Sequence, residues 1–368
     1  MRLALVELRR KPMRFAIAGS SLVLLAVLLL FLGGLLDGLY IGSTGLLRAQ
    51  QGELVVFSSD AKDSLIRSRI DPDVRARVEA VDGVAGTGGL GVALVGGEVP
   101  GRDELVNLSV TGFELPVSSM PADVELGPDQ ALADRSLEGF GVHLGDTVMV
   151  GSAKTPITVS GWVKDTNYLQ QGGFFVSPDT WRTVLAASRP DSNLPPATFQ
   201  VLVVKVADGA DPAVVADAID SATAGATSTL TRSEAVQALP GIKEQNATFS
   251  AIIYVTLFVA GLVVALFFAL LTLERIGLYS VLKAVGASTG QIFGGVVLQA
   301  VIVALLSFLL GGALMWLAAT FLLPAEIPVA LLPARAVQIA VGLVVMSALG
   351  AAVSLRRVVR VDPASAIG

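Results

Sequence analysis

Four long apolar blocks without a charged side chain interrupt the polar pattern of the chain, at residues 15–36, 251–273, 284–325 and 336–355. A helix rises about 1.5 Å per residue, so about 20 apolar residues cross a hydrocarbon core of about 30 Å. The pattern therefore predicts membrane helices at residues 15–40, 249–273, 291–323 and 336–355. A short interfacial segment is expected before the third helix.

The first apolar block has a second interpretation. Basic residues precede it, as they precede the apolar region of a cleaved secretory signal. We favour an uncleaved anchor, because the block is longer than a typical signal region and no clear A-x-A cleavage site follows it. The overall composition agrees with a membrane protein, since 53% of residues are hydrophobic, 15% are charged and the mean hydropathy is +0.70.

The segment between the first and second blocks, residues 41–248, has the pattern of a water-soluble α+β domain. Strands are predicted at residues 53–58, 91–95, 105–111, 147–150, 157–163, 173–176 and 199–206, and helices at 71–80 and 211–222. The order suggests one half built from 53–111 and 199–239, with the strand-rich middle inserted as the other half. The fold class is therefore a four-helix membrane protein with an α+β domain inserted after the first helix.

Basic side chains are concentrated on one side of the predicted helices. Five lie in the amino-terminal segment 1–14, two in 274–290 and three in the tail 356–368, whereas the loop 324–335 has one arginine and one glutamate. Because cytoplasmic flanks are enriched in Lys and Arg, we expect both termini and 274–290 in the cytoplasm of a bacterium, inside its plasma membrane. The inserted domain and the loop 324–335 then lie outside.

Composition and motifs exclude several kinds of chemistry. Residues 41–248 carry 26 acidic and 15 basic side chains, a net charge of −11, so no affinity for nucleic acid is expected. The chain has no cysteine and a single histidine, His143, which excludes thiolate sites and argues against a metal site. No P-loop motif and no charged side chain in mid-span occur, so neither ATP hydrolysis by this chain nor a proton relay is predicted. We interpret Gly145 and Asp146 as a tight turn.

The segment 274–290 is the most informative part of the sequence. Its apolar residues Ile276, Tyr279, Leu282 and Val285 follow helical spacing, and the charged residues between them can face water. Gly286 is expected to end this short amphipathic helix, because glycine accepts a left-handed conformation. Taken alone, such a helix is either a passive interfacial element or a docking site for a cytoplasmic partner.

The same segment resembles a motif of FtsX-like, MacB-type ABC transporter permeases, E-R-x-x-E-I-G-x-x-[RK]-A-[LV]-G-A-[ST]. The matching residues are Glu274, Arg275, Ile276, Gly277, Leu282, Lys283, Ala284, Val285, Gly286, Ala287 and Ser288. The spacing after the E-R pair is contracted, and Tyr279 and Ser280 stand where many members have Leu and Arg. Residues 3–15 and 356–368 are similar to the terminal signatures of the family, and the wording LYSVLKAVGAS is closer to DevC-like exporters.

This resemblance implies the partners and the activity. Residues 274–288 are expected to dock on a separate cytoplasmic ATPase, which binds ATP and Mg²⁺, with two permease chains pairing with two ATPase chains. The chain itself would then be no enzyme and would hold no cofactor. Export or extraction of a lipid-like, peptide or small hydrophobic substrate by mechanotransmission is implied, with a membrane-fusion protein as an accessory partner. Two alternatives remain: an FtsX-like activator of an external cell-wall hydrolase, and a membrane sensor or scaffold without an ATPase.

A glycine repeat suggests a further contact. Gly34, Gly38 and Gly42 recur every four residues and form a smooth helix face on which a helix of a second permease chain could pack.

Overall fold

The computed structural model describes residues 12–121, 124–189, 194–274, 277, 281, 285–324 and 327–358, with the backbone alone at 12–18 and 355–358. The chain divides into two units. The helical unit comprises Met1–Gly38 and Gln245–Gly368, and the inserted domain comprises Leu39–Glu244. The four apolar helices and the α+β domain between the first and second of them confirm the predicted fold class.

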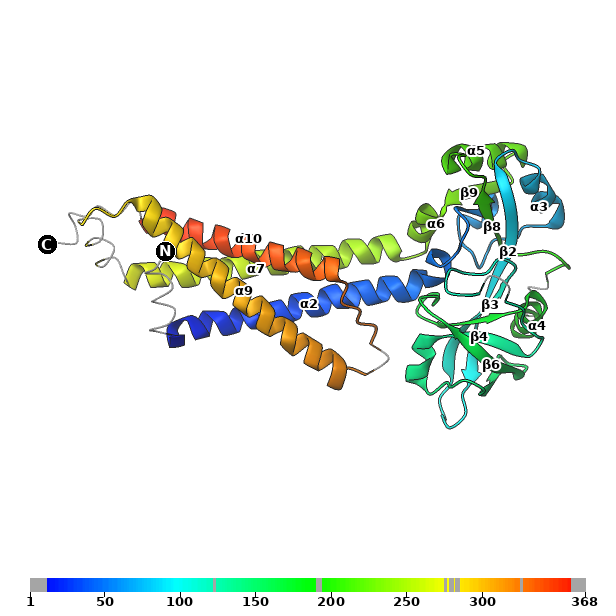
Figure 1. The fold of residues 1–368 in the computed structure, drawn as a ribbon, viewed down its shortest axis with the longest axis horizontal. Coiled ribbons are helices and arrows are strands. Elements are labelled where there is room, and N and C mark those ends of the chain that lie inside the picture. The colour runs from blue at the N-terminus through cyan, green and yellow to red at the C-terminus, as the bar shows by residue number, and fades with distance from the viewer. Residues whose placement is uncertain are drawn as a thin grey trace. The chain divides into compact units, whose positions relative to one another are not determined.

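The helical unit contains four long helices in its described residues, α2 (Pro12–Arg48), α7 (Ile242–Glu274), α9 (Thr289–Phe321) and α10 (Pro333–Val358) (Figure 1). Each is long and apolar enough to cross a membrane. Helices α2 and α7 extend well beyond the predicted spans, and their residues 39–48 and 242–244 belong to the inserted domain.

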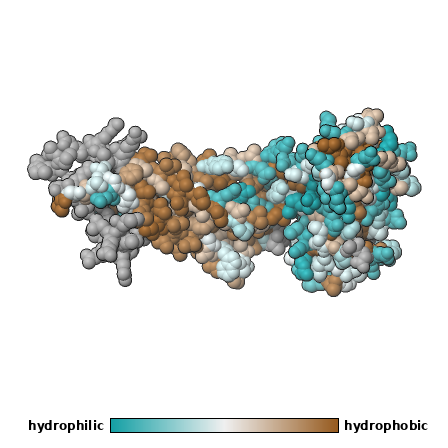
Figure 2. Space-filling model, turned by 45° about the horizontal axis from the view of Figure 1, so that its top comes forward, coloured by the Kyte–Doolittle hydropathy of each residue, from teal (hydrophilic) through white to brown (hydrophobic). Residues whose placement is uncertain are grey.

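Small residues bring the long helices together. A Cβ atom added to Gly311 of α9 would lie 2.8 Å from the Cβ of Ala26, and one added to Gly350 of α10 would overlap the backbone of Gly261 in α7. Apolar helices in lipid gain little from hydrophobic burial against each other, so close backbone approach of this kind stabilises their packing. Large apolar side chains cover the outward faces, and Figure 2 shows them as a hydrophobic surface over this unit.

The described residues of the inserted domain form nine strands: β1 (Leu54–Ser58), β2 (Val84–Glu98), β3 (Val106–Phe113), β4 (Gln130–Asp134), β5 (Thr147–Val150), β6 (Thr155–Val163), β7 (Gly172–Val176), β8 (Val201–Val206) and β9 (Thr227–Thr231). Six of them pair in a closed ring, β2-β3-β7-β4-β6-β5 and back to β2. The amino-terminal half of β2 leaves the ring and pairs with β8, which continues through β1 to β9. Strand β2 is thus shared by the ring and the open sheet.

Helices cover these two halves on separate apolar cores. Helices α3 (Pro72–Glu79) and α5 (Pro212–Ala222) bury Val78, Val215 and Ile219 against β1 and β8. Helix α4 (Pro178–Ser188) places Trp181 against β2 and β3, where Gly91 and Gly112 leave room for its indole ring. The short helix α6 (Arg232–Ala238) follows β9 and leads into α7.

Most predicted elements of the inserted domain are present, with two differences. The prediction missed β4, β9, α4 and α6, and it placed the strand at 105–111 in the wrong half, because β3 pairs with β7 inside the ring. The predicted turn at Gly145 is confirmed, since this glycine has a φ of 87° and Asp146 Oδ2 accepts from the backbone N–H of His143.

Candidate functional site

The segment between α7 and α9, which carries the predicted ATPase contact, is described only in part. Glu274 is the last residue of α7, and Gly277 and Val281 are helical. The backbone N–H of Val285 donates to the carbonyl of Val281 at 3.0 Å, so a helical turn reaches Val285. The remaining predicted contact residues lie outside the described residues: Arg275, Ile276, Tyr279, Leu282, Lys283 and Ala284.

Two features of the end of this segment follow from its sequence. Gly286 has a φ of 101°, a left-handed conformation that agrees with its expected role as a helix terminator. Ser288 caps the next helix, because its Oγ accepts from the N–H of Gln291 while Gln291 Oε1 accepts from the N–H of Ser288. Ser288 therefore has a structural role at the start of α9, whether or not a partner also contacts it.

Among the described residues of this segment, Val285 is the most exposed apolar side chain. It is 83% exposed, although the sequence places it on the apolar face of the predicted helix. An exposed valine next to a glycine with a left-handed backbone presents apolar surface at the end of the helical turn. This arrangement suits contact with a partner or with the membrane surface.

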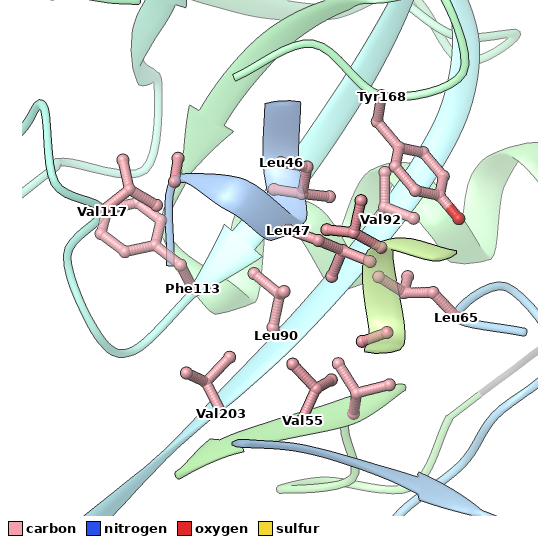
Figure 3. Close-up of a cluster of buried hydrophobic side chains, with 14 of the residues drawn as sticks. Leu46, Leu47, Val55, Leu65, Leu90, Val92, Phe113, Val117, Tyr168 and Val203 are labelled. Atoms are coloured by element: carbon pink, nitrogen blue, oxygen red, sulfur yellow. The ribbon is translucent and has the colours of Figure 1, made fainter. Parts of the chain in front are cut away.

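The chain enters and leaves the inserted domain through a single apolar core (Figure 3). Leu46 and Leu47, in the last turn of α2, are fully buried among residues of β1, β2 and β8. The exit segment contributes to the same core with Val236 and Leu239 around the end of α6, and with Ile242 at the start of α7. Both connections to the helical unit are therefore anchored at one place in the domain.

A loop of the inserted domain holds the last turns of α2. The Gln170 side chain donates to the carbonyl of Leu39 at 2.6 Å and to Ser43 Oγ at 2.9 Å, and the backbone N–H of Leu46 donates to Asn167 at 3.0 Å. Gly45 permits this approach, because an added Cβ would lie 2.7 Å from the carbonyl oxygen of Asp165.

The conformation of the loop 165–171 is unusual for its residue types. Asp165, Leu169 and Gln170 all have positive φ angles, which are costly for residues with a Cβ atom. Tyr168 is buried within the loop, and burial raises the pKa of its hydroxyl. The loop is thus held in one strained conformation against the end of α2, which indicates that residues 39–48 are firmly attached to the inserted domain.

The predicted glycine face has partners within this chain. A Cβ on Gly34 would lie 2.9 Å from Val329, one on Gly38 would overlap the carbonyl of Pro328, and one on Gly42 would lie 2.7 Å from Gln170. The N–H of Ala330 also donates to the carbonyl of Gly34 at 2.9 Å. The dimer contact stays a prediction, and a helix of a second chain would have to displace these segments to reach the glycines.

One buried ion pair fixes the same part of α2 to α10. Arg335 donates to Oδ1 of Asp37 through Nε at 3.1 Å and Nη2 at 2.9 Å, while Asp37 Oδ2 is buried and has no partner in the described structure. No local pattern in the sequence indicates a role for Asp37, because its partner lies almost 300 positions away.

Comparison with known families accounts for nearly the whole chain. Residues 16–222 match the MacB-like periplasmic core domain, and residues 250–363 match the FtsX-like permease C-terminal domain. The chain belongs to the FtsX-like, MacB-type family of ABC transporter permeases. An ABC transporter permease implies a partner ATPase, and the four apolar helices identify this permease as an inner-membrane protein.

The chain is also similar to individual relatives and solved structures. The permease is 27% identical over 372 residues to an uncharacterized ABC transporter permease of Mycobacterium tuberculosis, covering 99% of this chain and 98% of the relative. An uncharacterized ABC transporter permease of Mycobacterium bovis is 40% identical over 112 residues, 30% of this chain and 31% of the relative. The periplasmic region of MacB from Actinobacillus actinomycetemcomitans is similar at 13% identity and a TM-score of 0.36, covering 51% of this chain and 92% of that structure. The extracellular domain of the transporter YknZ, from Gram-positive bacteria, is similar at 15% identity and a TM-score of 0.33, covering 49% and 98%.

Proposed function

We propose that this permease transmits the movement of a separate, cytoplasmic ATPase to its inserted domain on the other side of the membrane. The ATPase would dock on residues 274–288, and helices α2 and α7 would carry the movement. Two permease chains with two ATPase chains, as the family resemblance implies, would form the working unit. Export or extraction of an apolar substrate is the activity that such a machine would perform.

The shared anchor of α2 and α7 in the inserted domain carries this proposal. Burying a leucine side chain stabilises a folded domain by about 1.5–3 kcal/mol. Leu46 and Leu47 are fully buried, and Leu239 and Ile242 are nearly so. Moving either helix against the domain would expose several of these side chains, so small helix movements would move the domain as a body.

The docking half of the proposal is tested with an exposed residue. Val285→Asp places a charge on the apolar surface of the segment 274–288 without disturbing a buried contact. We expect a loss of at least tenfold in the amount of ATPase that copurifies with the permease. Leu144→Asp is the matched control, because Leu144 is 60% exposed in the inserted domain and its substitution should leave copurification unchanged.

Two further variants test the shape of the segment. Gly286→Pro and Ala284→Asp should also reduce copurification while leaving membrane insertion intact. Normal recovery of the ATPase with Val285→Asp and with both of these variants would contradict docking at this segment.

The orientation is testable without removing native thiols, because the chain has no cysteine. Single substitutions Val285→Cys and Leu144→Cys provide exposed thiols in the docking segment and in the inserted domain. A membrane-impermeant maleimide added to intact cells, with the outer membrane permeabilised if there is one, should label Leu144→Cys and spare Val285→Cys. Labelling of both positions from the same side would refute the proposed topology.

A further inference from the structure

A hollow of about 510 Å³ lies in the inserted domain where the chain enters and leaves it. Its walls come from the end of α2, the start of β1, the start of α5 and the β9–α6 junction; they include Tyr40, Arg48, Glu53, Pro212, Arg232 and Val236. This volume falls within the range of about 300–1,000 Å³ that is usual for small-molecule sites.

The hollow lies close to two candidate membrane spans along the chain. Tyr40 is the second residue of the inserted domain and belongs to α2, which is long and apolar enough to cross a membrane. Val236 precedes by six positions the first residue of α7, Ile242, and α7 is also a candidate membrane span. The hollow is therefore joined to two candidate membrane spans by only a few positions of chain.

Two arginines supply positive charge to the hollow in a domain that is otherwise strongly acidic. Arg48 donates through Nε to Thr44 Oγ1 at 2.9 Å and lies 5.8 Å from the centre of the Tyr40 ring. Arg232 donates through Nη1 to the carbonyl of Gln50 at 2.6 Å. These contacts position both guanidinium groups, while Nη1 of Arg48 and Nη2 of Arg232 have no acceptor in the described part of the chain.

The acidic group in the wall does not neutralise both arginines. Glu53 Oε2 accepts from the backbone N–H of Val206 at 2.9 Å, and the described residues show no ion pair from Glu53 to either arginine. Two guanidinium groups and one carboxylate leave a net positive charge on the charged side chains of the wall. Guanidinium groups with free N–H donors bind phosphate oxygens in a paired geometry.

The rest of the wall is mixed: the ring of Tyr40 and the side chains of Pro212 and Val236 are apolar, and Thr231 and Ser233 add hydroxyl groups. A site with two positioned guanidinium groups, a partly apolar wall and a close connection along the chain to two candidate membrane spans matches a ligand with an anionic head and an apolar body. We propose that this hollow binds the phosphate group of an anionic amphiphile, with Arg48 and Arg232 as its ligands.

The test uses the full-length permease in a neutral detergent, with native mass spectrometry as the readout of bound lipid. Phosphatidylglycerol and phosphatidylcholine are titrated separately, and glycerol phosphate is added as the isolated head group. We expect one phosphatidylglycerol per chain to bind at least tenfold more tightly than phosphatidylcholine. The double variant Arg48→Gln/Arg232→Gln should lose this preference.

Matched variants distinguish lipid binding in this hollow from attraction to the overall charge of the protein. Arg67→Gln/Arg69→Gln removes the same charge from two exposed arginines outside the hollow and should leave the lipid preference unchanged. Ser233→Glu adds a negative charge to the wall and removes no arginine contact. An acidic residue is also favourable in the first turn of α6, so Ser233→Glu should fold normally and weaken phosphatidylglycerol binding.

Three results would overturn the inference. Equal affinity for the two lipids would exclude recognition of the phosphate charge, and an unchanged preference in both Arg48→Gln/Arg232→Gln and Ser233→Glu would exclude this hollow. Binding of glycerol phosphate as tight as that of the lipid would identify a free anion as the ligand and exclude an amphiphile. No ATPase or nucleotide is present in these measurements, so their failure would leave the proposed docking and transmission standing.

Discussion

The Asp37–Arg335 pair offers a sharp test of how α2 is held to α10. The Asp37 side chain is 6% exposed and the Arg335 side chain 29% exposed. Removing one member of a buried pair costs about 3–5 kcal/mol, because the other charge is left without compensation. Arg335→Met would strand a carboxylate that water cannot reach, and we expect a loss of about 3 kcal/mol, since the lost arginine was itself partly hydrated.

The converse substitution should cost less. Asp37→Asn keeps the shape of the side chain and an oxygen that can still accept from Arg335, and the arginine head is close enough to solvent to regain water. We expect a loss of about 1 kcal/mol, typical of a single hydrogen bond. Adding Asp37→Asn to Arg335→Met should recover about 1–2 kcal/mol, because the stranded charge disappears.

Thermal unfolding of the purified permease in one detergent measures these differences. For units of 150–250 residues, 1 kcal/mol corresponds to about 2–4 °C, so Arg335→Met should lower the midpoint by about 6–12 °C. The order of stability should be wild type, Asp37→Asn, the double variant and then Arg335→Met. If the double variant unfolds below Arg335→Met, the buried-charge reasoning is wrong.

Three other perturbations have defined outcomes. Gly286→Ala forces a Cβ into a left-handed conformation at a cost of about 1–2 kcal/mol, and it should reduce ATPase copurification less than Gly286→Pro does. Thr231→Ala removes the capping box of α6 and should cost about 1 kcal/mol in thermal unfolding at pH 7. The hydrogen bond from Thr231 lowers the pKa of Glu234. The stability that this hydrogen bond adds is therefore present above the unfolded pKa of Glu234 and is lost as pH falls through the lower folded pKa. The difference in stability between wild type and Thr231→Ala should consequently become smaller in acid. Gly91→Val would drive a side chain into the Trp181 ring and should shift the tryptophan emission of the protein, to which Trp162 and Trp316 also contribute; an unshifted spectrum would contradict the packing.

The long helices were predictable because a segment that crosses lipid must be apolar along its whole length. Uncharged blocks of 20 or more residues are compatible with few other structures. Their ends were less predictable. The predicted span stops at residue 40, whereas α2 continues to Arg48, and Arg335, distant in sequence, compensates the charge of Asp37 within it. A helix that continues into a second domain gives no local signal of where the lipid ends.

Some elements of the inserted domain have recognisable sequence signals, and others have none. Helices α4 and α6 were missed although their caps are visible in the sequence, as Ser177 before Pro178 and as Thr231 three residues before Glu234. The loop 165–171 has no such signal, because its left-handed residues are not glycines and its shape depends on the end of α2. The positive hollow was equally hidden, since Arg48 and Arg232 are brought together only by folding.

Strand β2 has a consequence for how this domain comes apart. Its residues 84–90 complete the open sheet and its residues 90–98 close the ring, so neither half owns a complete set of strands without it. A proline or a proteolytic cut near residue 90 would remove the strand pairing of β2 from both halves at once. Neither half should therefore fold as a separate fragment. The domain should consequently melt in a single cooperative transition, as one indivisible body suited to being pushed from one end.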